Sequence, residues 1–240
     1  MIPFTRSRRT TGLLASVNSC AEAAIVLDGG ADIIDLKDPS RGALGALDAP
    51  VVRAVVRQVA GRVPVSATVG DLVAMEPGEL AAAAAQMADT GVDYVKLGFF
   101  PSDTTGACIE ALAPLAARGV RLIAVLFADL GFAPDVSRRC ADAGFAGVMI
   151  DTARKGEGSL RRWLDDRELG SFVAEARRRD LIAGLAGSLG IADIAPLLAL
   201  APDYLGFRGA LCSVGQRTAG LDPTAFARVR AALRAERQTA

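Results

Sequence analysis

The chain of 240 residues contains no histidine. Without an imidazole it cannot carry a Ser-His-Asp or Cys-His catalytic group or hold a metal ion through histidine. Lysine is almost as scarce: of the 27 basic residues only Lys37, Lys96 and Lys155 are lysines, and the other 24 are arginines. A GC-rich genome also favours arginine, so the positions of the three lysines have to decide whether they matter.

Three further features are absent from the sequence, and each excludes a class of protein. The four cysteines are far apart and form no CxxC pair, which indicates neither a zinc site nor a disulfide framework. No apolar run reaches the roughly 18 to 20 residues that span a bilayer. Acidic and basic residues cancel at 27 each, so no net charge attracts nucleic acid or an anionic membrane. We therefore expect a globular protein with a small-molecule partner and no nucleic acid or membrane partner. Assembly into a homo-oligomer is a separate expectation that these features do not test.

The N-terminal segment is basic, with Arg6, Arg8 and Arg9 ahead of an apolar stretch that begins at Gly12. This order is faintly similar to a twin-arginine export signal. However, Asn18 ends the apolar stretch too early for a signal, which needs roughly 7 to 15 apolar residues. We expect a basic tail over 1–11, one folded domain over 12–240, and a location in the cytoplasm.

Short apolar runs alternate with longer segments of helical periodicity along the whole chain. Eight strands are predicted at 12–17, 32–37, 63–69, 94–99, 121–127, 147–152, 181–186 and 204–208. Each is followed by a predicted helix, at 19–28, 49–60, 77–90, 105–118, 135–143, 167–179, 191–199 and 223–235. Left-handed caps are expected at glycines that follow five of these helices, Gly29, Gly61, Gly91, Gly119 and Gly144.

Eight repeated strand-helix units, with strands apolar on both faces, are typical of a closed parallel barrel wrapped in helices. The length fits as well, because such barrels need about 250 residues. The sequence therefore predicts an α/β fold, a single (β/α)8 TIM barrel. An open doubly wound sheet is the alternative that the same alternation allows.

All three lysines fall at the end of this barrel where chemistry is expected, the carboxyl ends of the strands. Lys37 ends the second predicted strand, Lys96 lies in the fourth and Lys155 follows the sixth. Alternate strands supply each layer of side chains inside such a barrel, so these even-numbered strands meet across its interior. Asp35 shares a strand face with Lys37, and Asp151 ends the sixth strand. We expect two lysines and two carboxylates around one cavity.

One interpretation of this cluster is an ion-pair network that holds the barrel closed. Such networks contribute little stability, because taking each ion out of water costs several kcal/mol. Crowding and burial also lower the pKa of an ammonium group, and the neutral amine is the form that attacks a carbonyl carbon. We therefore favour imine chemistry, with Lys37 as the residue that bonds to substrate.

Small residues in the loops after the seventh and eighth strands indicate a phosphate site. These loops contain LAGS (185–188) and GFRGA (206–210), and in such barrels their backbone N–H groups and a helix N-terminus attract the anion. We predict phosphate contacts from Gly187, Ser188 and Gly209, and a bidentate contact from Arg208. Tight packing explains such glycines as well, so their location in the barrel carries the prediction.

The chain resembles the (5-formylfuran-3-yl)methyl phosphate synthase family of methanofuran biosynthesis over nearly its whole length. The resemblance is carried by GGADIIDLKDPSRGALGA (29–46), VSATVGD (65–71), DYVKLG (93–98), DTARK (151–155), LAGS (185–188) and FRGA (207–210). It implies a TIM-barrel lyase that joins two molecules of glyceraldehyde 3-phosphate into a furan aldehyde bearing one phosphate. Phosphate and water are released, and no metal or organic cofactor is implied.

The resemblance also implies roles for individual residues. Lys37 is expected to form the Schiff base and Lys96 to transfer protons, while Asp35, Asp151 and Lys155 match further active-site positions. This division of labour agrees with the chemistry, because an imine supplies the enamine that an aldol step needs.

Two triose phosphates require two anion sites. Lys155, with Ser66 or Thr68 on the third strand, is expected to serve the second site. The chain departs from the family at Gln216, where the family usually has aspartate before an arginine, here Arg217. Two alternatives stay open: a class I aldolase for another sugar phosphate, and a non-catalytic barrel that binds a phosphorylated metabolite.

Overall fold

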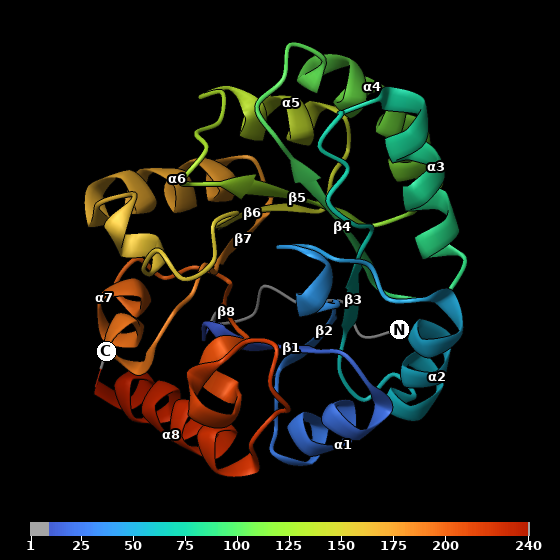
Figure 1. The fold of residues 1–240 in the computed structure, drawn as a ribbon. Coiled ribbons are helices and arrows are strands. Elements are labelled where there is room, and N and C mark those ends of the chain that lie inside the picture. Colours follow the sequence, from blue (N-terminus) through green and yellow to red (C-terminus); the bar gives the residue numbers. More distant parts are fainter. Residues whose placement is uncertain (1–9, 240) are drawn as a thin grey trace.

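The computed structural model describes residues 10–239 as eight parallel strands that close into a barrel inside a ring of helices (Figure 1). The strands follow chain order around the barrel, and β8 pairs with β1 to close it. They are β1 (Gly12–Val17), β2 (Ile33–Leu36), β3 (Val65–Thr68), β4 (Tyr94–Phe99), β5 (Leu122–Phe127), β6 (Gly147–Asp151), β7 (Ile182–Leu185) and β8 (Tyr204–Phe207). The predicted TIM barrel is confirmed. Residues 1–9 of the predicted basic tail lie outside the described residues.

An α-helix follows each strand, as predicted. The helices are α1 (Cys20–Asp28), α2 (Ala49–Val59), α3 (Pro77–Ala88), α4 (Thr105–Ala117), α5 (Val136–Asp142), α6 (Asp166–Arg178), α7 (Ile194–Leu198) and α8 (Pro223–Thr239). The predicted seventh helix is divided, because a 3₁₀ turn over Ile191–Asp193 precedes α7. Pro196 lies inside this segment and has no N–H to donate to the carbonyl four residues earlier.

One of the predicted caps was wrong. Gly29 has a right-handed φ of −72°, and the left-handed residue after α1 is Gly30, with a φ of 85°. A one-residue offset of this kind is common at helix ends, where the final turn is set by local contacts. Among the described residues, no helix has the length and apolar character needed to cross a membrane.

The core has two parts, because every strand is covered on both faces. The larger part lies between the barrel and the helices. The smaller part fills the barrel interior with side chains that include Leu14, Ile33, Ile123, Met149 and Tyr204. The interior becomes polar toward the carboxyl ends of the strands, where Ser16, Asp35, Ser66, Lys96 and Asp151 are buried.

Candidate active site

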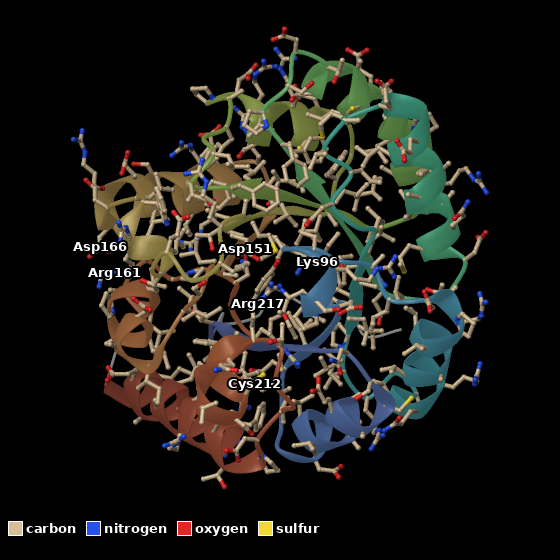
Figure 2. The ribbon with its side chains drawn as sticks, viewed as in Figure 1. Lys96, Asp151, Arg161, Asp166, Cys212 and Arg217 are labelled. Carbon is tan, nitrogen blue, oxygen red and sulfur yellow. The ribbon has the colours of Figure 1, made fainter. Side chains whose placement is uncertain are left out.

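The three lysines meet at one cavity of about 590 Å³ at the carboxyl ends of the strands. Lys37 follows β2, Lys96 lies within β4, and Lys155 lies in the loop after β6. Asp151, the last residue of β6, also lines the cavity. The fold thus brings together residues from units two, four and six, as the layer argument predicts. Figure 2 shows Lys96 and Asp151 near the barrel axis.

Asp35 lies beneath the cavity and is fully buried. Its carboxylate accepts hydrogen bonds from the Lys96 ammonium at 2.9 Å, the Ser66 hydroxyl at 2.7 Å and the Ser16 hydroxyl at 2.9 Å. Burial by itself raises the pKa of Asp35, but the Lys96 and Lys37 charges outweigh it and the pKa lies below its ordinary value. Asp35 is therefore an anion that orients Lys96, and Ser66 contacts this pair from β3.

Asp151 lies between the other two lysines. Its carboxylate accepts a 2.6 Å hydrogen bond from Lys155 and lies 3.8 Å from the Lys37 nitrogen, and the backbone N–H of Thr152 donates to it at 2.7 Å. Burial raises the pKa of Asp151, yet Lys155 and Lys37 lower it to about 2. Asp151 is thus ionised at any physiological pH, accepts a hydrogen bond from Lys155 and forms a longer ion pair with Lys37.

The surroundings of Lys37 disfavour the charged form of its amine. Only 6% of its surface is exposed. Burial lowers the pKa of its amine to about 8, with Asp151 opposing this shift and Lys155 adding to it. About one molecule in ten then has a neutral amine at pH 7, against fewer than one in a thousand for an ordinary lysine. The neutral amine can attack a carbonyl carbon in the cavity.

Thr68 contacts the loop after β2 and does not line the cavity. It is fully buried, and its hydroxyl donates to the carbonyls of Gly45 at 3.1 Å and Leu36 at 3.4 Å. Asp71 holds the same loop, because its carboxylate accepts the backbone N–H groups of Ala43 at 2.8 Å and Leu44 at 2.9 Å. The segment after β3 therefore fixes the loop that follows Lys37.

The loops after β7 and β8 present backbone donors to the cavity. Gly187 and Ser188 adopt left-handed conformations, with φ of 113° and 50°, and line the cavity together with Gly209. Among the described residues, the backbone N–H groups of these three meet no protein acceptor. A glycine suits position 187, because residues with a Cβ rarely adopt a φ of 113° and an added Cβ would lie only 3.0 Å from the side chain of Thr152. Such converging N–H groups are suited to an anion.

Arg208 lies at the wall of the cavity, but its guanidinium faces protein groups. The charge of the Arg208 guanidinium is neutralised there, because both terminal nitrogens pair with the buried carboxylate of Glu22 on α1. Its remaining N–H groups donate to the carbonyls of Ser16, Arg217 and Ala219. Arg208 therefore ties β1, α1 and the loop after β8 together.

Three residues of this region were not among the predicted site residues: Glu22, Asp71 and Arg217. Asp71 ends VSATVGD (65–71), one of the segments that carry the family resemblance, and Arg217 follows the departure from the family at Gln216. The sequence around Glu22 contains no pattern that predicts a role in the site. Arg217 and Gln216 both line the cavity. Among residues 10–239, no group of three or more Cys, Asp and Glu side chains is arranged to hold a metal ion.

Solved structures share the fold at low sequence identity. The 3-hexulose-6-phosphate synthase of Salmonella typhimurium superposes with a TM-score of 0.68 at 17% identity, over 94% of this chain and 100% of that one. Phosphoribosyl anthranilate isomerase of Thermus thermophilus gives a TM-score of 0.65 at 15% identity, over 94% and 99% of the two chains. These likenesses show the barrel fold alone.

Sequence relatives are closer. A Methylorubrum extorquens protein provisionally named (5-formylfuran-3-yl)methyl phosphate synthase is 47% identical over 224 residues, 93% of this chain and 92% of the relative. The (5-formylfuran-3-yl)methyl phosphate synthase of Methanosarcina acetivorans is 35% identical over 218 residues, 86% of this chain and 93% of the relative. The family model for 4-HFC-P synthase matches residues 13–230. Because these matches span almost the whole barrel, the chain belongs to the (5-formylfuran-3-yl)methyl phosphate synthase family.

Proposed function

We propose that this protein joins two molecules of glyceraldehyde 3-phosphate into (5-formylfuran-3-yl)methyl phosphate, through a Schiff base on Lys37. The observation that carries the proposal is the Lys37 amine, which is buried at the cavity and has a pKa of about 8. An amine of this kind forms an imine with an aldehyde, and the imine makes the adjacent carbon acidic enough to become an enamine.

The reaction balances without an oxidant or a reductant. Two C3H7O6P units give the product C6H7O6P, one phosphoric acid and two waters. Carbon–carbon bond formation, loss of phosphate, ring closure and dehydration all require protons to be moved between substrate atoms. In this proposal Lys96, held by Asp35 at 2.9 Å, and Lys155, held by Asp151 at 2.6 Å, exchange those protons.

The charges around the cavity also suit phosphorylated substrates. Three lysines face two carboxylates, Asp35 and Asp151, and the backbone donors of Gly187, Ser188 and Gly209 add to the attraction for anions. Lys155 is proposed to contact the second triose phosphate. The contacts of Thr68 with the loop after β2 favour a supporting role over the phosphate contact expected from the sequence.

The test is incubation of the purified protein with glyceraldehyde 3-phosphate, followed by ultraviolet absorption and phosphate measurement. We expect a conjugated furan aldehyde and one phosphate released per product. A simple aldolase would form a sugar phosphate and release no phosphate, and a non-catalytic barrel would form neither. Absence of both the furan and the phosphate would rule out the proposed reaction.

The nucleophile is tested by borohydride reduction in the presence of substrate. We expect a mass increase on a peptide that contains Lys37, with loss of adduct and turnover in Lys37→Met. The matched variant Lys96→Met removes a second buried lysine from the same cavity and should keep the adduct while losing turnover by at least about a hundredfold, as general acid-base catalysis contributes 10²–10⁴. An active Lys37→Met variant would reject the assignment.

A further inference from the structure

The guanidinium of Arg208 has no donor left for a substrate. An arginine has five N–H groups. Nε donates to the carbonyl of Arg217 at 2.8 Å, one terminal nitrogen donates to Ser16 and Glu22, and the other donates to Glu22 and Ala219. All five donors are thereby used by protein acceptors, and the charge is neutralised by a carboxylate that is itself buried.

Glu22 is the centre of this arrangement. Besides Arg208, its carboxylate accepts the backbone N–H groups of Asn18 at 2.9 Å and Leu221 at 3.0 Å. Glu22 therefore connects the end of β1 to the end of the segment 212–221. This segment is part of the connection between β8 and α8. Arg208 holds the middle of the same segment through the Arg217 and Ala219 carbonyls. The two residues fix the backbone of the loop over the cavity.

Arg217 is the cation that this loop presents. Its guanidinium lines the cavity and is half-buried, and one terminal nitrogen donates to the carbonyl of Gly42 at 2.8 Å. Within the described part of the chain, no carboxylate lies within ion-pair distance of it. Burial lowers the pKa of Arg217, and Asp151 is near enough to oppose this shift. In Figure 2 the labelled Arg217 projects over the centre of the barrel. Several of its donors thus remain for a ligand in the cavity.

We propose that Arg217, and not Arg208, is the arginine that binds a phosphate group of the substrate. The ligand lies between the Arg217 guanidinium and the backbone donors of Gly187, Ser188 and Gly209, which line the same cavity. Arginine binds phosphate through two parallel N–H groups, so its planar donors add direction to the charge. This inference rests on the proposed function in that the substrate carries a phosphate.

The first test measures binding of inorganic phosphate to the intact protein by titration calorimetry, which needs no turnover. We expect Arg217→Met to bind phosphate at least tenfold more weakly than the wild type. Arg154→Met is the matched control, because Arg154 lies at the same end of the barrel on the loop after β6, is exposed, and does not line the cavity. It should bind phosphate within twofold of the wild type. Equal binding by the wild type and Arg217→Met would overturn the proposal.

The second test separates phosphate recognition from damage to the site. Borohydride trapping at Lys37 is compared for glyceraldehyde 3-phosphate and for glyceraldehyde, which lacks the phosphate, each at a concentration well below saturation. Arg217→Met should lose at least tenfold in trapping of the phosphorylated aldehyde and change less than twofold with glyceraldehyde. An equal loss with both aldehydes would mean that Arg217 supports the structure of the site, and the proposal would fail. Neither test uses furan formation, so the proposed reaction can fail independently.

Discussion

Lys37 shows how the barrel changes the charge state of one side chain. Its ammonium is removed from water and meets Asp151 only at 3.8 Å, while Lys155 takes the short contact with the same carboxylate. Asp151 is therefore shared unequally, and it opposes the fall in the Lys37 pKa only from the longer distance. This arrangement supplies a neutral amine without a histidine to remove its proton.

The first prediction concerns the pH dependence of imine formation. Because the neutral amine attacks and the pKa of Lys37 is about 8, the rate of trapping should rise about tenfold per pH unit below pH 8 and level off above it. Unphosphorylated glyceraldehyde is the substrate to use, since it has no ionisation of its own in this range. A midpoint near pH 10 would indicate an ordinary exposed lysine.

The second prediction is that Lys37 lowers the stability of the fold. Its pKa is about 8 in the folded state and 10.5 as an ordinary lysine. The unfolded chain then binds more protons between these values, so the penalty is fully present below pH 8 and is relieved as pH rises from 8 to 10.5. Lys37→Met should raise the free energy of unfolding at pH 7 by about 1 to 3 kcal/mol.

Urea unfolding of the wild type and Lys37→Met at pH 7 and at pH 9.5 measures this effect. The gain from Lys37→Met should be smaller at the higher pH, because the wild-type amine is then mostly neutral. A variant less stable than the wild type at pH 7 would show that the contact between Lys37 and Asp151 outweighs burial.

The sequence allowed the positions of the lysines around the cavity to be predicted, but not the contacts of the arginines. Strand periodicity and the parity of barrel strands bring Lys37, Lys96 and Asp151 together, and both are properties of the repeat. The assignment of Arg208 depends on which acceptors its guanidinium meets, and the main one is Glu22, 186 residues away along the chain. No local sequence pattern predicts a contact over that distance. The sequence therefore predicted that Arg208 lies at the end of β8, but not which groups its guanidinium contacts.

At the scale of elements, the loop after β2 links Lys37 to the loops that follow β3 and β8. It follows Lys37 directly, and Asp71 fixes it through two backbone N–H groups from the loop after β3. Gly42 allows this approach, because a Cβ at this position would lie 1.9 Å from the Asp71 carboxylate. Arg217 then contacts the Gly42 carbonyl from the loop after β8. Three loops are joined above the cavity in this way.

The third prediction tests this connection with Asp71→Asn. An amide has one acceptor oxygen and turns an N–H donor toward a second donor, so at least one charge-assisted hydrogen bond, about 1.5 to 3 kcal/mol, is lost. The loop over 38–46 should open more often, and trypsin should cleave after Arg41 at least about tenfold faster. Asp89→Asn, an exposed aspartate at the end of α3, is the control and should leave this rate unchanged. Equal cleavage rates in both variants would contradict the role of Asp71.

Elements were predicted well where the pattern is regular. The bounds of β1 and β4 agree with the sequence prediction, and each of the other strands is shorter by one to three residues. Apolar flanking residues such as Val63, Val69 and Leu181 continue the strand pattern but belong to loops. The division at α7 and the shift from Gly29 to Gly30 depend on the hydrogen bonds of single turns. The periodicity of apolar residues predicts where a helix lies but not the hydrogen bonds of its last turn.

At the scale of the whole molecule, the barrel closes around side chains of very unequal size. Gly184 on β7 pairs in register with Tyr204 on β8. The Tyr204 ring fills the interior and its hydroxyl donates to the sulfur of Met149 on β6 at 3.4 Å. A Cβ added at Gly184 would lie 2.2 Å from the Tyr204 ring, so the absence of a side chain on β7 makes room for a large one on β8. Layered packing of this kind supports the polar site above it.

The fourth prediction compares Gly→Ala substitutions at a crowded position in the barrel interior and at an open position on a helix. Gly184→Ala forces the buried Tyr204 ring to move within a closed interior, which should lower the free energy of unfolding by about 1 to 3 kcal/mol. Gly78→Ala, in the first turn of α3 with open space around it, should leave stability unchanged or raise it by up to about 1 kcal/mol, since alanine favours a helix. For a chain of this size Gly184→Ala should lower the midpoint of thermal unfolding by roughly 2 to 4 °C per kcal/mol, whereas Gly78→Ala should leave the midpoint unchanged or raise it. If Gly184→Ala were as stable as Gly78→Ala, the ring of Tyr204 would have room to move, and the interior beneath Lys96 would be looser than the contacts of Gly184 require.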